Sequence, residues 1–99
     1  MNVIEFDLDS WYLLSDDRHR YFDVRSGFGG YSFWLLIELN SVEWEGYENG
    51  GRYYIQALAD SVRRRPHKFS ARNEPVEKQR EVYEFLMAWL QKPRPNSDP

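Results

Sequence analysis

The chain has 99 residues, a formal net charge of −3 and no cysteine, and charged residues make up 29% and aromatic residues 17% of the sequence. This length corresponds to one domain, and the composition excludes both a disordered chain and a membrane protein. The lack of cysteine excludes disulfides, thiolate catalysis and cysteine-ligated zinc, and it fits the reducing conditions of a cytoplasm.

The first ten residues, MNVIEFDLDS, contain acids where a signal peptide would have a basic start and an apolar run. No run approaches the ~18 apolar residues that a membrane-spanning helix needs. We therefore expect a cytoplasmic protein that does not associate with a membrane.

Short apolar segments in the first 40 residues predict an antiparallel meander of three to four strands. Residues 3–8 and 21–25 alternate between apolar and polar side chains, with Phe22 and Val24 pointing inward, and residues 11–14 are an apolar run between them. Glycines at 27, 29 and 30 then break the chain before a long strand over residues 31–39.

The strand over residues 31–39 has two apolar faces. Phe33, Leu35, Ile37 and Leu39 fall on one face at a period of two. The opposite face is half apolar, because Trp34 and Leu36 alternate there with Ser32 and Glu38. Both faces therefore need a covering layer, from this chain or from a partner.

A long helix is predicted over residues 41–64. Asn40 and Glu43 have the spacing of a capping box, and apolar residues recur at spacings of three and four from Trp44 to Val62. Because this helical spacing continues through Gly51, we expect one uninterrupted helix. Gly51 has no side chain, and we expect this to let the helix approach the sheet closely.

A second, C-terminal helix is predicted over residues 75–91, after Pro66 ends the first. Its apolar residues cover an arc of about 200°, which is wider than one contact face needs. We expect a single α+β domain over residues 1–92, and a disordered tail over the proline-rich residues 93–99.

The wide helix arc and the two-sided strand have two interpretations. Each can cover the other within one domain, which is the commoner outcome. Alternatively, part of both surfaces stays exposed as a protein interface, for which a second copy of the chain is the simplest partner. The candidate interface residues are Tyr21, Trp34, Leu36, Phe85 and Trp89. The leading functional prediction is a non-enzymatic protein-binding module, partnered by another protein or by itself as a homodimer.

A nucleic-acid-binding module is the alternative prediction. Residues 26–33 resemble the RNP1 motif of RNA-recognition domains at Gly27, Phe28, Gly29 and Phe33, although no helix precedes them. The candidate contacts to an anion or nucleic acid are Phe28, Tyr31, Arg63, Arg64, Arg65, Lys68 and Arg72. Residues 1–60 carry 11 acidic and 4 basic residues, which disfavours nucleic acid as a partner and suggests instead that the basic second part pairs with them internally.

The densest polar cluster along the chain is Asp16, Asp17, His19 and Asp23. These residue types could bind a metal or act as acid and base. They occupy a predicted hairpin turn, however, where Asp is expected for backbone reasons. We therefore predict no enzyme activity, no catalytic or metal-binding residue and no cofactor.

Residues 39–77, and especially GGRYYIQALAD followed by RRRPHKFSARN, resemble a family of short uncharacterised bacterial proteins. The resemblance implies a bacterial, cytosolic origin and transfers no functional residue. Small acidic α+β proteins of this kind are often immunity or antitoxin-like binders, which is an analogy to the predicted binding module.

Overall fold

The computed structural model describes residues 1–28 and 31–92, without the side chains of Phe28 and Tyr31. It confirms the α+β fold: four strands form one antiparallel sheet in the order of the sequence, and helices follow. The strands are β1 (Asn2–Asp7), β2 (Trp11–Ser15), β3 (Arg20–Phe28) and β4 (Tyr31–Glu38). The helices are α1 (Ser41–Arg64), the short α2 (Pro66–Phe69), a 3₁₀ turn (Ser70–Arg72) and α3 (Val76–Gln91). The predicted Gly29-Gly30 break and the tail over residues 93–99 lie outside the described residues.

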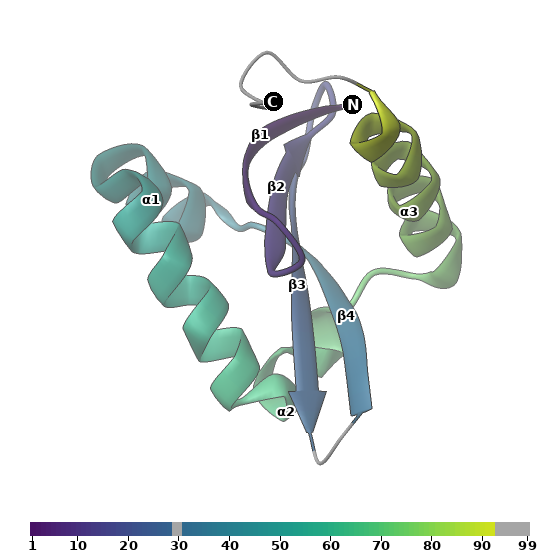
Figure 1. The fold of residues 1–99 in the computed structure, drawn as a ribbon. Coiled ribbons are helices and arrows are strands. Elements are labelled where there is room, and N and C mark those ends of the chain that lie inside the picture. The colour runs from purple at the N-terminus through teal and green to yellow at the C-terminus, as the bar shows by residue number, and fades with distance from the viewer. Residues whose placement is uncertain (29–30, 93–99) are drawn as a thin grey trace.

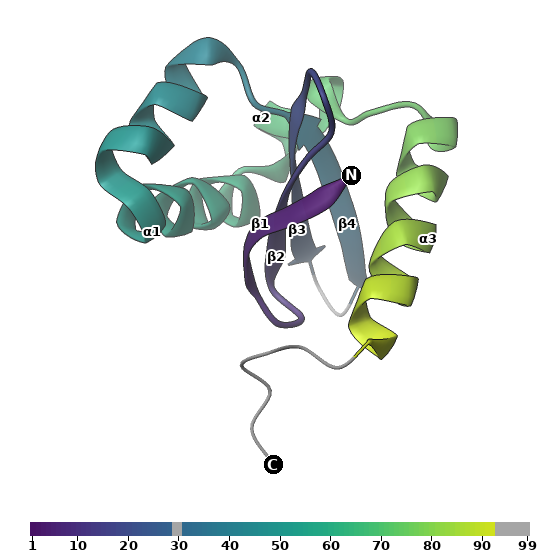
Figure 2. The ribbon, with the colours of Figure 1, turned by 90° about the horizontal axis from the view of Figure 1, so that it is seen from above.

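The sheet is the middle layer of the molecule, with α1 on one face and α3 on the other (Figures 1 and 2). This arrangement explains why residues 11–14 of β2 are all buried and why they read as a continuous apolar run. Trp11 and Leu13 belong to the core under α1, whereas Tyr12 and Leu14 belong to the core under α3.

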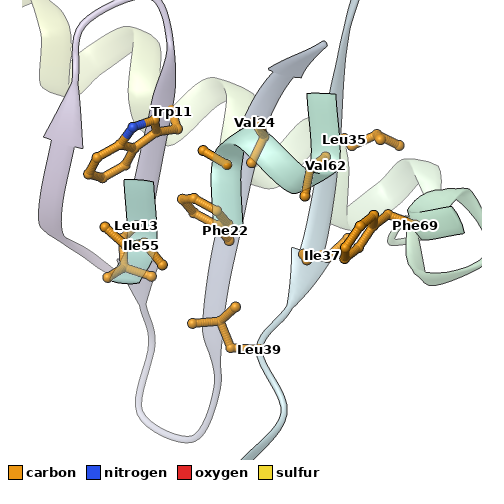
Figure 3. Close-up of a cluster of buried hydrophobic side chains, with 11 residues drawn as sticks. Trp11, Leu13, Phe22, Val24, Leu35, Ile37, Leu39, Ile55, Val62 and Phe69 are labelled. Atoms are coloured by element: carbon orange, nitrogen blue, oxygen red, sulfur yellow. The ribbon is translucent and has the colours of Figure 1, made fainter. Parts of the chain in front are cut away.

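The first core lies between the sheet and α1 (Figure 3). Ile55, Ala59 and Val62 of α1 pack there against strand residues, and Phe69 of α2 closes one end. The buried strand residues are Trp11, Leu13, Phe22, Val24, Leu35 and Ile37, joined by Leu39 just beyond β4. The predicted inward face of the last strand is therefore buried from Leu35 onward, while Phe33 remains 39% exposed.

The second core lies between the sheet and α3. Val82 and Leu86 of α3 pack against the buried face that carries Tyr12, Leu14, Tyr21 and Leu36. Within the chain, α3 thus covers most of the second sheet face. Among the described residues, no helix is both long and apolar enough to cross a membrane.

The start of α1 confirms the predicted capping box. The Asn40 side chain accepts a hydrogen bond from the Glu43 backbone N–H at 2.8 Å, and the Glu43 carboxylate accepts one from the Asn40 N–H at 3.0 Å. The bounds of the helix also agree with the prediction, but its straightness does not. Gly51 has φ 59° and ψ −140°, so two helical arms meet there at a kink.

The kink changes the role of the glycines in α1. A Cβ built on Gly51 would meet nothing within 4 Å, so the predicted close approach of Gly51 to the sheet is wrong. Gly51 is needed because its backbone lies in a region that is essentially restricted to glycine. The close approach is at Gly46 instead, where an added Cβ would overlap the ring of Tyr54 from the other arm.

Polar contacts attach α1 to its surroundings. Arg52 lies 3.1 Å from the Glu5 carboxylate of β1, and the Tyr47 hydroxyl donates to the same carboxylate at 2.7 Å. Arg72 forms two hydrogen bonds to the Glu43 carboxylate, at 2.7 and 2.8 Å. The Arg72–Glu43 pair agrees with the expected pairing between the basic second part of the chain and the acidic first part.

Candidate binding groove between the sheet and α3

A groove with a volume of about 570 Å³ opens between the sheet and α3, a size typical of ligand sites. Its sheet side is formed by Tyr12, Asp23, Phe33, Trp34 and Leu36. Its helix side is formed by Val76, Gln79, Arg80, Tyr83, Leu86, Met87 and Leu90. The groove is thus mostly apolar, with a few polar side chains.

The wide apolar arc of α3 accounts for this groove. The centre of the arc, Val82 and Leu86, packs on the sheet. One flank packs towards β1 and β2, since the ring of Trp89 lies 5.0 Å from that of Phe6 and 6.3 Å from that of Tyr12. The other flank recurs at helical spacing and lines the groove, with Val76, Tyr83, Met87 and Leu90. One helix therefore serves both as a core element and as one wall of a site.

The rim of the groove exposes several large apolar side chains. Phe33 and Trp34 of β4 are each 39% exposed. On α3, Met87 is 38%, Tyr83 60% and Val76 64% exposed. Exposed apolar side chains scattered singly are normal, but these five border one cavity.

Asp23 is the unusual group in the groove. It lies opposite Tyr12 of β2 and Leu36 of β4, and it is only 9% exposed. Among residues 1–28 and 31–92, nothing hydrogen-bonds or ion-pairs with its carboxylate. Burial therefore acts alone on this group and raises the pKa of Asp23 to about 7.

Two aromatic rings lie over the strand that carries Asp23. The ring centroids of Tyr12 and Trp34 are 5.8 Å apart, with the ring planes inclined by 33°. Because β2 and β4 flank β3, this pair spans β3 on the groove side. The groove thus combines an aromatic pair with a buried carboxyl group.

The five predicted interface residues fall into different environments. Trp34 lies on the groove rim and Leu36, 2% exposed, lies on its floor. Tyr21 is buried in the second core, and Phe85 and Trp89 are half-buried against that core. The structure therefore brings Trp34 and Leu36 together in the groove and uses the other three within the fold.

Sequence reasoning missed most of the groove. The α3 residues Val76, Tyr83 and Met87 belong to the wide apolar arc, so the sequence carried a signal for them. The sequence marks Tyr12 only as a member of the predicted apolar strand over residues 11–14, and not as a site residue. In the sequence Asp23 belongs to the predicted polar turn cluster, whereas its position opposite Leu36 puts it in an apolar environment.

The predicted anion-binding residues are also divided. Arg63 donates to the carbonyl oxygens of Ser10 and Arg25, each at 3.1 Å, and Arg72 is held by Glu43. These two guanidinium groups hold parts of the fold together. The exposed members of the set are Arg64, Arg65 and Lys68. The side chains of Phe28 and Tyr31 lie outside the described part of the structure.

The polar cluster near the second turn does not converge on one site. Asp16 accepts hydrogen bonds from the backbone N–H groups of Arg18 and His19, at 2.9 and 2.8 Å, and the bond from Arg18 is the main cause that lowers the pKa of Asp16. His19 pairs with Glu38 at 2.7 Å, and Asp23 faces the groove. Within the described residues, no group of three or more His, Asp or Glu side chains could hold a metal ion.

Comparison with known proteins gives no match to a protein-family model, a curated protein or a solved structure. Inference about function therefore depends on the chemistry of the groove itself. That chemistry is suited to binding: apolar and aromatic walls can remove apolar groups from water, and a few polar side chains can orient them.

Proposed function

We propose that this protein is a non-enzymatic binding module whose groove between the sheet and α3 receives apolar side chains of a partner protein. The single observation that carries the proposal is the group of five exposed apolar side chains around one cavity: Phe33, Trp34, Val76, Tyr83 and Met87. Covering them would remove apolar surface from water, which is the main driving force of protein association. Trp, Tyr and Met are also the residue types enriched in protein interfaces.

The proposal includes a bacterial, cytoplasmic setting and a role like that of an immunity or antitoxin protein, on the analogy with small acidic α+β binders. Lack of cysteine is compatible with that setting. The partner is a different protein in this proposal, and a homodimer is a separate outcome that the same experiment would reveal.

Site-specific photocrosslinking in the native host tests the proposal. A photoreactive residue is introduced at Met87, on the groove rim, or as a matched control at Tyr53, which is 91% exposed on α1. We expect a discrete protein adduct from position 87 and none from position 53. Excess unlabelled wild-type protein should compete for the adduct, and a Trp34→Ala competitor should fail to do so.

Adducts of equal intensity from both positions, or no adduct from position 87, would contradict the proposal. An adduct composed of two copies of this chain would show that the groove is a homodimer interface.

A further inference from the structure

We propose that the groove contains a subsite for a primary ammonium group, in which the Asp23 carboxylate and the rings of Tyr12 and Trp34 bind a lysine side chain of the partner. This inference rests on the proposed function, because the lysine belongs to the partner protein. It specifies the chemistry that the partner must bring to a mostly apolar surface.

Asp23 has no hydrogen-bonding or charged partner among residues 1–28 and 31–92. Asp23 is only 9% exposed, so its carboxylate loses much of its hydration, and this loss is costly unless an opposite charge or hydrogen-bond donors replace it. Two arginines are close in the fold: Arg80 lines the same groove, and Arg25 follows Asp23 by two residues on the same face of β3. In the described structure, neither forms an ion pair with Asp23.

The aromatic pair of Tyr12 and Trp34 also attracts a cation. The face of a Trp or Tyr ring attracts a cation within about 6 Å of its centroid, most strongly where water is excluded. The Tyr12 and Trp34 rings span the strand that carries Asp23, so a cation that reaches the carboxylate also approaches the rings. The carboxylate and the rings therefore both favour a positive charge, and both disfavour an anion.

The lining of the groove favours lysine over arginine. Lysine has a compact ammonium group on an unbranched aliphatic stem, which can lie against Leu36, Leu86 and Leu90. Guanidinium carries five N–H donors in a planar fork. A floor with one carboxylate would leave several of these donors unpaired, and buried unpaired donors reduce affinity.

The protonation of Asp23 agrees with this subsite. With a pKa of about 7, the carboxyl is close to equally ionised and neutral at neutral pH in the unbound protein. A bound ammonium group would stabilise the ionised form and replace the missing charge partner. In the described part of the structure Asp23 thus lacks a charge partner, and a bound ammonium group would supply one.

NMR titration of the full chain with three small probes tests the subsite. n-Butylammonium represents the lysine side chain, n-butanol is its neutral isostere, and n-butylguanidinium represents arginine. Two variants are compared with wild type: Asp23→Asn, and Asp17→Asn as a control that removes an equal charge at an exposed turn position.

We expect n-butylammonium to shift the amide resonances of Asp23 and Leu36 saturably, with affinity about tenfold higher than that of n-butanol or n-butylguanidinium, as one charge-assisted contact would give. The Asp23→Asn substitution should abolish this preference, and Asp17→Asn should preserve it. Equal affinities for n-butylammonium and n-butanol in wild type, absence of saturable n-butylammonium binding, or an unchanged affinity in Asp23→Asn would overturn the inference.

The outcome is separable from that of the proposed function. If the adduct at position 87 forms but n-butylammonium has no preference, the groove remains a protein-binding site and only the lysine subsite is wrong. If that adduct does not form, the proposed function fails, whatever the probes show.

Discussion

Tyr12 and Trp34 belong to strands on either side of β3, yet their ring centroids are 5.8 Å apart, so the two rings meet across the strand that carries Asp23. This contact joins the core under α3 to the exposed rim of the groove, because Tyr12 is 3% and Trp34 39% exposed. The binding surface is thus built directly on a buried and well-packed layer. Such support positions interface side chains more precisely than a loop would.

The carboxyl of Asp23 should make the stability of the protein depend on pH. The pKa of Asp23 is about 7 in the folded protein, whereas an unfolded chain has the usual value near 4. The folded state therefore holds this proton more tightly than the unfolded state. Wild type should be destabilised progressively as pH rises from about 4 to 7, by up to about 4 kcal/mol at pH 8.

Urea unfolding near pH 4 and near pH 8 measures this dependence, with Asp23→Asn as the test and Asp17→Asn as the charge-matched control. Asp23→Asn should be more stable than wild type at about pH 8, by a margin that shrinks towards pH 4. Tyr12, Tyr83 and Arg80 also line this cavity, and they are the same in wild type and in Asp23→Asn, so a difference between the two pH profiles reports on Asp23. If the free energies of unfolding of wild type and Asp23→Asn changed in parallel with pH, this result would contradict the burial of Asp23.

Gly51→Ala should destabilise the protein by about 2 kcal/mol, because φ 59° with ψ −140° is strained for any residue with a Cβ. Space is not the cause, since nothing lies within 4 Å of the added atom. Thermal unfolding measures the effect, and Asn49→Ala, at an exposed position in the same helix, should stay within about 0.5 kcal/mol of wild type. A stabilising effect of Gly51→Ala would indicate a straight α1 in solution.

The Arg72–Glu43 pair should contribute to stability at neutral pH. Burial alone would raise the pKa of Glu43, but hydrogen bonds from Arg72 and from the Asn40 backbone overcome this effect and lower it. Arg72→Ala should therefore cost about 2 kcal/mol in chemical unfolding at pH 7, and less at a pH below the lowered pKa of Glu43 in the folded protein, where Glu43 is protonated in both the folded and the unfolded state. Arg64→Ala, which removes an exposed charge, should have little effect. Equal effects of the two substitutions would contradict the structural role of Arg72.

Local sequence signals predicted the parts of the fold that local interactions determine. Alternation and a short apolar run predicted a meander of three to four strands, of which the structure has four, and the spacing of Asn40 and Glu43 located the start of α1. The kink at Gly51 could not be found in this way, because the apolar residues of both arms still recur at helical spacing. A glycine conformation that preserves this spacing leaves no trace in the apolar pattern.

The groove depends on tertiary placement, which the sequence does not encode locally. The apolar arc of α3 was visible, but which flank packs inward depends on how the helix lies across the sheet. The sequence places Asp23 in a polar cluster near a predicted hairpin turn. The structure places Asp23 within β3 on the side of the second core, because α3 returns from far along the chain to cover that side.

Trp34 and Trp89 should separate binding from stability. Trp89 packs edge-on against Phe6 at 5.0 Å, so Trp89→Ala should cost about 3 kcal/mol in urea unfolding. Trp34→Ala should cost about 1 kcal/mol or less, since the side chain is 39% exposed, and it should nevertheless remove the photocrosslinked adduct formed from position 87. The adduct should persist in Trp89→Ala at a temperature where that variant remains folded. Loss of the adduct in Trp89→Ala and its retention in Trp34→Ala would place the partner on the other flank of α3.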